Sequence, residues 1–219
     1  MTSVDTEAPV HLLPYVDSID GLRRAGHLFW QRGWSRGTSS NYSVVVDRNP
    51  LKLLVTASGK DKGQLSRADF VLVDADGKPI AEGQPKSSAE TLLHCVAAEN
   101  TEVGAILHTH SVWSTVLSAR FAPQGGILVE GYEMLKGLSG VTTHEHAEWF
   151  PIFDNTQDIP SLAVQVRAAM QDPDRPLSHG YLIHQHGIYT WGRDLDEAMR
   201  HIEIMEFLLE CLGRQASLK

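Results

Sequence analysis

An apolar run at residues 103–110, V-G-A-I-L-H-T-H, ends in two histidines that are separated by one residue. Such a run is typical of a buried strand, in which successive side chains point to opposite faces. His108 and His110 therefore point to the same face, and Thr109 points away from them. Two imidazoles side by side at a strand end can share one metal ion. The segment thus predicts a metalloenzyme whose other site residues surround that ion.

Composition narrows the class of fold and partner. The chain has 219 residues, of which 42% are hydrophobic, which is enough material for one domain with a full core. A net charge of −8 argues against binding to a nucleic-acid backbone, because that requires a basic face. The N-terminus lacks the pattern of a signal peptide, and no segment approaches the ~20 apolar residues of a membrane span. We therefore expect a cytoplasmic protein, with Cys95 and Cys211 unpaired in helices.

Periodicity and turn residues predict a single layered α/β domain rather than a strict βαβ repeat. Residues 1 to about 17 are expected to be a flexible segment. Helices are expected at about 18–32, from Ser87 or Ser88 to 99, at 112–119 and 161–171, and from an Asp194 cap to Gly213. Strands are expected at 42–46, 51–56, 70–73, 78–81, 103–108, 126–130, 181–184 and 187–190, the first four as two hairpins.

Two further H-x-H pairs occur in the chain. The pair His184 and His186 closes another apolar run, so it could meet the first pair from a neighbouring strand. The pair His144 and His146 lies in a polar stretch without a strand pattern, which indicates a surface or substrate-facing position. Three imidazoles with an open fourth position are typical of catalytic zinc. Nickel, iron(II), manganese or cobalt could use the same ligands.

Two carboxylates are candidates for proton transfer. Glu90 lies in K-S-S-A-E-T-L-L-H, at the start of the helix before the histidine strand, where it could equally serve the helix dipole. Glu133 lies in E-G-Y-E-M-L-K-G between two glycines, where it could equally be an exposed loop acid. The residues alone leave both alternatives open.

A phosphate site is suggested by T-A-S-G-K-D-K-G, residues 56–63. Ser58 and Gly59 would turn the backbone so that N–H groups form an anion-binding concavity, and Lys60 and Lys62 would add positive charge. The preceding turn G-T-S-S-N, residues 37–41, offers further hydroxyl and amide groups. A solvated loop remains the alternative for both segments.

Three motifs together resemble the class II aldolase superfamily, the zinc sugar-phosphate lyases and epimerases. They are S-S-A-E-T-L-L-H, A-I-L-H-T-H-S and H-G-I-Y-T-W-G-R-D-L-D-E-A, and the resemblance covers about residues 20–213. Three segments are similar to one branch, the methylthioribulose-1-phosphate dehydratases of methionine salvage: G-Y-E-M-L-K-G (131–137), P-I-F-D-N-T-Q-D-I (151–159) and H-G-I-Y-T-W-G-R-D (186–194). The resemblance implies an α/β/α domain with a mixed, largely antiparallel sheet, and a homotetramer.

The resemblance also implies roles for individual residues. His108, His110 and His186 would bind one zinc ion per subunit, and Glu133 would be the acid/base of the dehydratase branch. Glu90 stands where the aldolase branch carries its catalytic carboxylate. The positions that correspond to the phosphate site of the superfamily are Asn41, Ser58, Gly59 and Ser88.

The expected reaction is removal of water from 5-methylthioribulose 1-phosphate, a small sugar phosphate, to give 2,3-diketo-5-methylthiopentyl 1-phosphate. Two departures bear on it: Ala89 separates Ser88 from Glu90 where aldolases pair two serines, and Ser40-Asn41 replaces a Gly-Asn pair. An aldolase or epimerase acting on another sugar phosphate is the alternative. A non-catalytic scaffold ranks last, because all three histidines are present.

Overall fold

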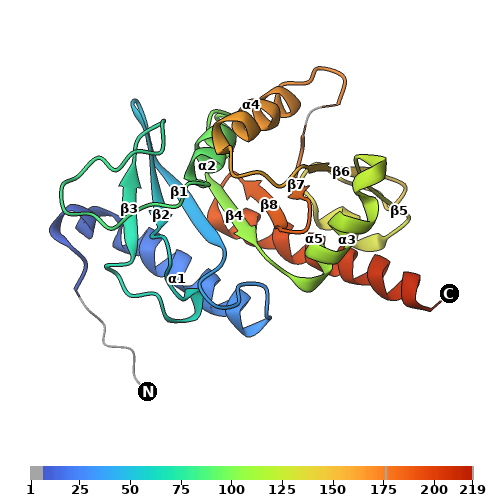
Figure 1. Ribbon diagram of the computed structural model, residues 1–219, viewed down its shortest axis with the longest axis horizontal. Helices are drawn as coiled ribbons and strands as arrows, with labels where there is room; N and C mark the ends of the chain where they lie inside the picture. Colours follow the sequence, from blue (N-terminus) through green and yellow to red (C-terminus); the bar gives the residue numbers. More distant parts are fainter. Residues whose placement is uncertain (1–6, 176, 219) are drawn as a thin grey trace.

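A twisted sheet with helices on both faces forms the body of the protein in the computed structural model, which describes residues 7–175 and 177–218. The described residues form eight strands in the order β3-β2-β1-β4-β8-β7-β6-β5 (Figure 1). Their bounds are β1 Asn41–Arg48, β2 Leu51–Thr56, β3 Phe70–Val73, β4 Ala105–Thr109, β5 Gly126–Glu130, β6 Ala147–Phe153, β7 Gly180–Ile183 and β8 Gly187–Gly192. Within this sheet β6 and β7 pair in parallel, and the other neighbours pair antiparallel.

The helices cover the sheet in two layers. They are α1 Val16–Gln31, α2 Thr91–Ala98, α3 Val112–Phe121, α4 Ile159–Met170 and α5 Leu195–Ser217, with short 3₁₀ turns η1 Val10–Tyr15, η2 Lys62–Gln64, η3 Ala122–Gln124 and η4 Glu133–Gly137. Alternate residues of β4 serve the two layers: Leu107 packs into the core with α1 and α5, and Ile106 into the core with α2 and α4. The expected α/β/α domain with a mixed, largely antiparallel sheet is confirmed.

Several expected boundaries were wrong. The helix expected from Ser18 begins at Val16, and η1 precedes it with Leu12 fully buried, so this part of the expected flexible segment is packed. Residues 1–6 lie outside the described residues. The long last helix has the expected Asp194 cap but continues past Gly213 to Ser217. At Gly213 a Cβ atom would lie 2.2 Å from the ring of Trp113, so this glycine serves helix packing rather than termination.

Two sheet elements also differ from expectation. The strand expected at 78–81 is reduced to one bridge between Val73 and Pro79, because proline lacks the N–H that a ladder needs. Conversely, β6 was not expected. Its sequence A-E-W-F-P-I-F contains Pro151, yet five of its residues pair with β5 across the full length of that strand.

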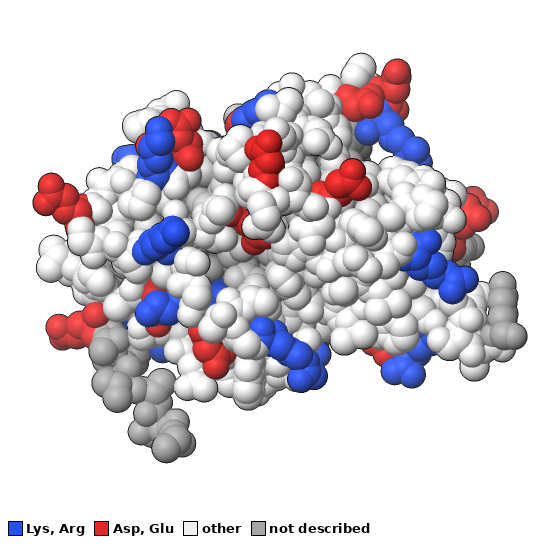
Figure 2. All heavy atoms as spheres, viewed as in Figure 1, with Lys and Arg blue, Asp and Glu red and all other residues white. Residues whose placement is uncertain are grey.

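Charged side chains of both signs are mixed on one face of the protein. On the face shown in Figure 2, Lys and Arg side chains are interspersed with Asp and Glu. This face therefore has no extended basic surface that could bind a nucleic-acid backbone, in agreement with the net charge of −8. In the described part of the chain, no helix combines the length and apolar character that crossing a membrane requires.

Candidate active site

Three histidines meet where β4 ends and β8 begins. The two strands pair antiparallel, with His108 opposite Tyr189 and Thr109 opposite Ile188, so the end of β4 lies beside the turn that carries His186. The close approach depends on Gly187, at which a Cβ atom would lie 2.1 Å from the carbonyl oxygen of Thr109. The alternation of histidines in the sequence therefore correctly predicts that these three side chains lie together.

The donor set fits a metal ion. His108, His110 and His186 each offer a ring nitrogen, and these atoms lie within 4.8 Å of one another. His108 donates from Nδ1 to the carbonyl of Ile188 at 3.0 Å, which leaves the lone pair on Nε2, and that buried atom has no hydrogen-bond partner among the described residues. Burial lowers the pKa of His108 well below its usual value and that of His110 to about 4, so both rings are neutral, as metal ligands must be.

Glu90 lies directly beside this cluster. Its Oε1 is 3.2 Å from His186 Nε2, and its Oε2 is 3.8 Å from His108 Nε2. The helix that was expected to include Glu90 starts one residue later, at Thr91, because residues 88–90 form a turn in which Ser88 accepts from the backbone of Thr91. Glu90 is thus the N-cap residue, and its carboxylate reaches across to β1 instead of lying along the helix.

A hydrogen-bonded chain holds the Glu90 carboxylate. Asn41 Nδ2 donates to Glu90 Oε2 at 2.8 Å, and Asn41 Oδ1 accepts from His94 Nε2. Ser43 Oγ then donates to His94 Nδ1 at 2.8 Å. Burial lowers the pKa of His94 to about 3, so the ring is neutral and carries its proton on Nε2. That tautomer fixes which way the Asn41 amide faces.

Sequence reasoning missed His94 and two tyrosines behind the site. Tyr189 stacks on His108 with ring centroids 3.9 Å apart and meets His94 edge-on at 5.7 Å. Tyr181 stacks on the other side of Tyr189 at 4.9 Å. All three rings are fully buried or nearly so. The only signal for the two tyrosines was their place on the strands β7 and β8 beside His186, which is also where ordinary core aromatics occur, and His94 lies within helix α2 with no signal of its own.

A cavity of about 180 Å³ opens in front of the histidines. The residues expected to bind phosphate that line it are Asn41, Ser58, Gly59 and Ser88, together with Glu90, His110 and His186. Further hydroxyl groups come from Thr38, Ser39, Ser40 and Thr56. The buried Ser39 Oγ has no hydrogen-bond partner in the described structure, so a donor is available there for an anion.

The two lysines of the expected phosphate loop do not line this cavity. Lys60 forms an ion pair with Asp69 at 2.7 Å, and Lys62 is buried. Lys62 Nζ donates to the carbonyls of Lys60 at 2.7 Å and Thr38 at 3.4 Å, which ties the two cavity loops together. Burial lowers the pKa of Lys62 to about 8. In a Gly-rich loop, the sequence alone does not show whether a lysine binds an anion or donates hydrogen bonds to backbone carbonyls.

Two site residues adopt left-handed backbone conformations that glycine adopts more easily. Ser40 has φ +72° just before Asn41, and Gln185 has φ +52° just before His186. Non-glycine residues held in this region store strain that the surrounding structure must offset, which occurs often at functional sites.

Glu133 does not line the cavity of its own chain. It begins η4, its side chain is 71% exposed, and its Oε1 accepts from Lys136 at 2.7 Å. His144 Nδ1 lies 3.7 Å from its other oxygen. The hydrogen bond from Lys136 lowers the pKa of Glu133, so it is a carboxylate at neutral pH. His146 also lies away from the metal cluster, where it contacts Glu148 at 2.6 Å.

Comparison with known proteins agrees with this geometry. Residues 20–212 match the family model "Class II Aldolase and Adducin N-terminal domain". A protein of Marinobacter nauticus named methylthioribulose-1-phosphate dehydratase is 48% identical over 200 residues, covering 90% of this chain and 93% of its own length. A protein of the same name from Pseudomonas fluorescens is 49% identical, covering 85% and 88%. An L-fuculose-1-phosphate aldolase from Thermus thermophilus shares the fold with a TM-score of 0.73 at 19% identity, covering 93% and 97%. The chain belongs to the class II aldolase and adducin N-terminal domain family.

Proposed function

We propose that this protein is a methylthioribulose-1-phosphate dehydratase, which removes water from 5-methylthioribulose 1-phosphate in methionine salvage. The observation that carries the proposal is the cluster of three histidines beside Glu90, at the mouth of a cavity lined by hydroxyl and backbone donors. The relatives that carry this name at 46–49% identity support the choice of substrate. The unpaired Cys95 and Cys211 are consistent with a cytoplasmic protein.

Zinc is the proposed ion, held by His108, His110 and His186, because three imidazoles without a thiolate are typical of catalytic zinc. A bound zinc ion would supply Lewis-acid polarisation of the substrate ketone. The loops at residues 38–40 and 58–59 would hold the phosphate through N–H and O–H groups. Their position opposite the histidines would orient the sugar chain across Glu90.

The proton transfers need one carboxylate that acts twice. A carboxylate takes the C3 proton, and the resulting carboxyl group gives that proton to the departing C4 hydroxyl, which leaves as water. The enol then tautomerises to the 2,3-diketone, so every carbon of the substrate is retained. We propose Glu133 for this role, with Glu90 held in place beside the metal ligands by Asn41.

Glu133 can fulfil this role only if a neighbouring subunit brings it to the cavity, because within one chain it is exposed and lies outside the lining. We therefore propose a homo-oligomer, by resemblance a tetramer, with active sites at the contacts between subunits. Exposed apolar side chains near η4, Met134 at 41% and Leu128 at 49%, support such a contact.

One observation favours a second candidate, a class II aldolase. Glu90, at the position of the aldolase carboxylate, is the acid beside the ligands in this chain. A product assay with the zinc-loaded enzyme and 5-methylthioribulose 1-phosphate separates the two. A single diketone product that retains all carbons supports the dehydratase, whereas two carbonyl fragments from the same substrate would overturn it in favour of the aldolase.

A further inference from the structure

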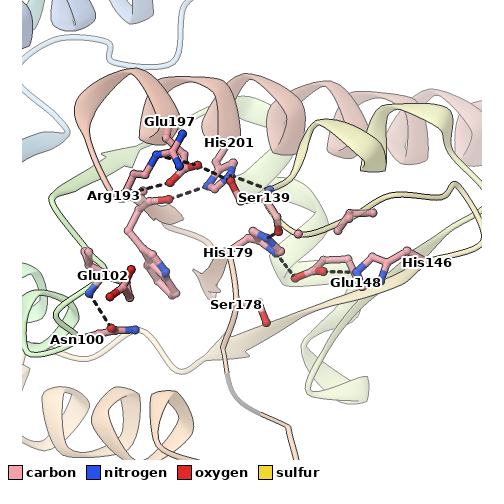
Figure 3. A pocket seen from close by; sticks show the side chains of 15 residues that line it. Asn100, Glu102, Ser139, His146, Glu148, Ser178, His179, Arg193, Glu197 and His201 are labelled. Carbon is pink, nitrogen blue, oxygen red and sulfur yellow. Dashed lines mark hydrogen bonds and ion pairs between the residues drawn. The ribbon is translucent and has the colours of Figure 1, made fainter.

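A second group of titratable side chains surrounds another cavity, of about 370 Å³, whose lining includes none of the three metal-binding histidines. Figure 3 shows His179, Glu197 and His201 around Ser139, with Glu148 bonded to His179. Glu148 comes from β6, His179 precedes β7, and Glu197 and His201 belong to α5. All four are at least 90% buried. Such an arrangement in the interior needs a reason, because buried ionisable groups are costly unless they are paired.

Ser139 is bonded through three of its polar atoms. Its carbonyl accepts from His179 Nε2 at 2.8 Å, and its backbone N–H donates to His201 Nε2 at 3.1 Å. Its hydroxyl donates to Glu197 Oε1 at 2.5 Å. These bonds come from two separate parts of the chain, the segment before β7 and the helix α5.

The partners of His179 require it to be an imidazolium. Its Nδ1 faces Glu148 Oε1 at 2.8 Å, and its Nε2 faces the Ser139 carbonyl. Both of these atoms are acceptors, so both ring nitrogens must carry protons. The hydrogen bond and charge of Glu148 raise the pKa of His179 above its usual value, despite the opposing effect of burial.

The same network holds the segment that carries Glu133. Ser139 lies two residues beyond η4, Glu133–Gly137. The carbonyl of Gly137 accepts from Arg200 Nε at 3.0 Å, and Arg200 Nη2 reaches the Ser139 hydroxyl at 3.1 Å. At Gly137 a Cβ atom would meet Ile204 at 2.3 Å, so this turn is pressed against α5. Displacing Ser139 would therefore displace the turn that presents Glu133.

We propose that protonated His179 is a positioning residue for Glu133, acting through Ser139 to fix the η4 turn. The inference rests on the proposed function in one respect, the role of Glu133 as acid/base. On one side, His179 is held by Glu148, which also contacts His146. On the other side, its ring meets the ring of His201 edge-on, with ring centroids 5.1 Å apart. The charge of Glu197 also acts on His179 and favours its protonated form. Loss of the His179 proton leaves one of its two acceptors without a donor, and the η4 turn loosens.

The test compares His179→Gln with the matched control His146→Gln. Both changes remove an imidazole that bonds Glu148, but His146 has no bond to Ser139. Hydrogen exchange of residues 133–139 and the pH profile of kcat are measured on the zinc-loaded enzyme. In the wild type, protection of this segment and kcat should fall together as the pH rises through the titration of His179.

His179→Gln should lose protection at all pH values and lower kcat about 10- to 100-fold, with KM changed less than about threefold and zinc content unchanged. Glu148→Gln is a second variant that keeps the imidazole. It should shift the basic limb of both profiles to lower pH, because removing the carboxylate lowers the pKa of His179.

Equal protection and equal pH profiles for His179→Gln and His146→Gln would overturn the inference. So would a Glu148→Gln profile that does not move. Should the product assay reveal an aldolase, the proposed function would fail, while the exchange measurement would still decide whether His179 fixes the turn.

Discussion

Asn41 Nδ2 donates a 2.8 Å hydrogen bond to Glu90 Oε2, and this bond ties strand β1 to the turn before α2 beside the three clustered histidines. The amide can face only one way, because its oxygen accepts from the neutral ring of His94. Asn41, which we expect to bind phosphate, therefore also orients the carboxylate of Glu90. The position of Glu90 is consequently set by the core on the α2 side of the sheet.

Replacing Asn41 by aspartate should impair the enzyme through this contact. Asn41→Asp keeps an acceptor for His94 but replaces the donor to Glu90 with a second carboxylate, and the two like charges repel each other. We expect kcat to fall about 10- to 100-fold, because Glu90 is displaced from its place beside the three histidines. Zinc analysis and measurement of kcat check this. Asn41→Ala, which adds no charge, should lower kcat less.

Gly187 is expected to be essential for metal binding. Any Cβ at this position collides with the backbone of Thr109, so Gly187→Ala should separate β4 from β8, where His108 and His186 approach each other. We expect a loss of about 2 kcal/mol or more in the free energy of unfolding, together with loss of zinc. The control is Gly125→Ala. There φ is +74° with no atom within 4 Å, so backbone strain of about 1 kcal/mol should leave zinc bound.

A site shared between subunits predicts complementation. Glu133→Gln should keep zinc and lose dehydration, and His108→Ala should lose both. When the two inactive proteins are mixed and allowed to exchange subunits, sites that combine His108 of one chain with Glu133 of another should recover a fraction of the wild-type kcat. Activity that stays at background after exchange, with mixed oligomers verified by mass spectrometry, would place both residues in the same chain or remove Glu133 from the reaction.

The sequence predicted the grouping of the three histidines because strand alternation is a local rule. His108 and His110 share a face by periodicity alone, and His186 follows from the pairing of two apolar runs. The loop at Ser58 and Gly59 could also be predicted from the sequence, because turn residues that follow a strand indicate exposed backbone N–H groups. These features depend on a few neighbouring residues.

Features set by packing between distant segments were not predictable. Lys60 forms an ion pair with Asp69, which lies outside the loop motif, and Lys62 donates hydrogen bonds to two carbonyl groups. The strand β6 was missed because Pro151 argues against a strand. The hydrogen bond that His179 donates to Glu148 on this strand was missed with it. His94 resembled any polar residue of a helix until the fold placed it against Asn41.

Glu206 predicts an unusual pH dependence of stability. It lies fully buried on α5, where Thr109 Oγ1 donates to its Oε1 at 2.9 Å, and burial raises its pKa from 4.5 to about 7. Between these values the native state holds a proton that the unfolded state has released. The contribution of this group to stability therefore falls as the pH rises from about 4.5 to 7 and is constant above that, with a total of about 3 kcal/mol at most.

The variant Glu206→Gln isolates this effect, because it stays neutral at every pH. Subtracting the wild-type free energy of unfolding from that of Glu206→Gln cancels the buried histidines, which destabilise the native state as the pH falls below 6.5 in both proteins. The difference should rise from its value near pH 4.5 to a plateau above pH 7, measured by urea unfolding. A difference that is flat over this range would mean that Glu206 is ionised in the native state as it is in the unfolded chain, and the prediction would be wrong.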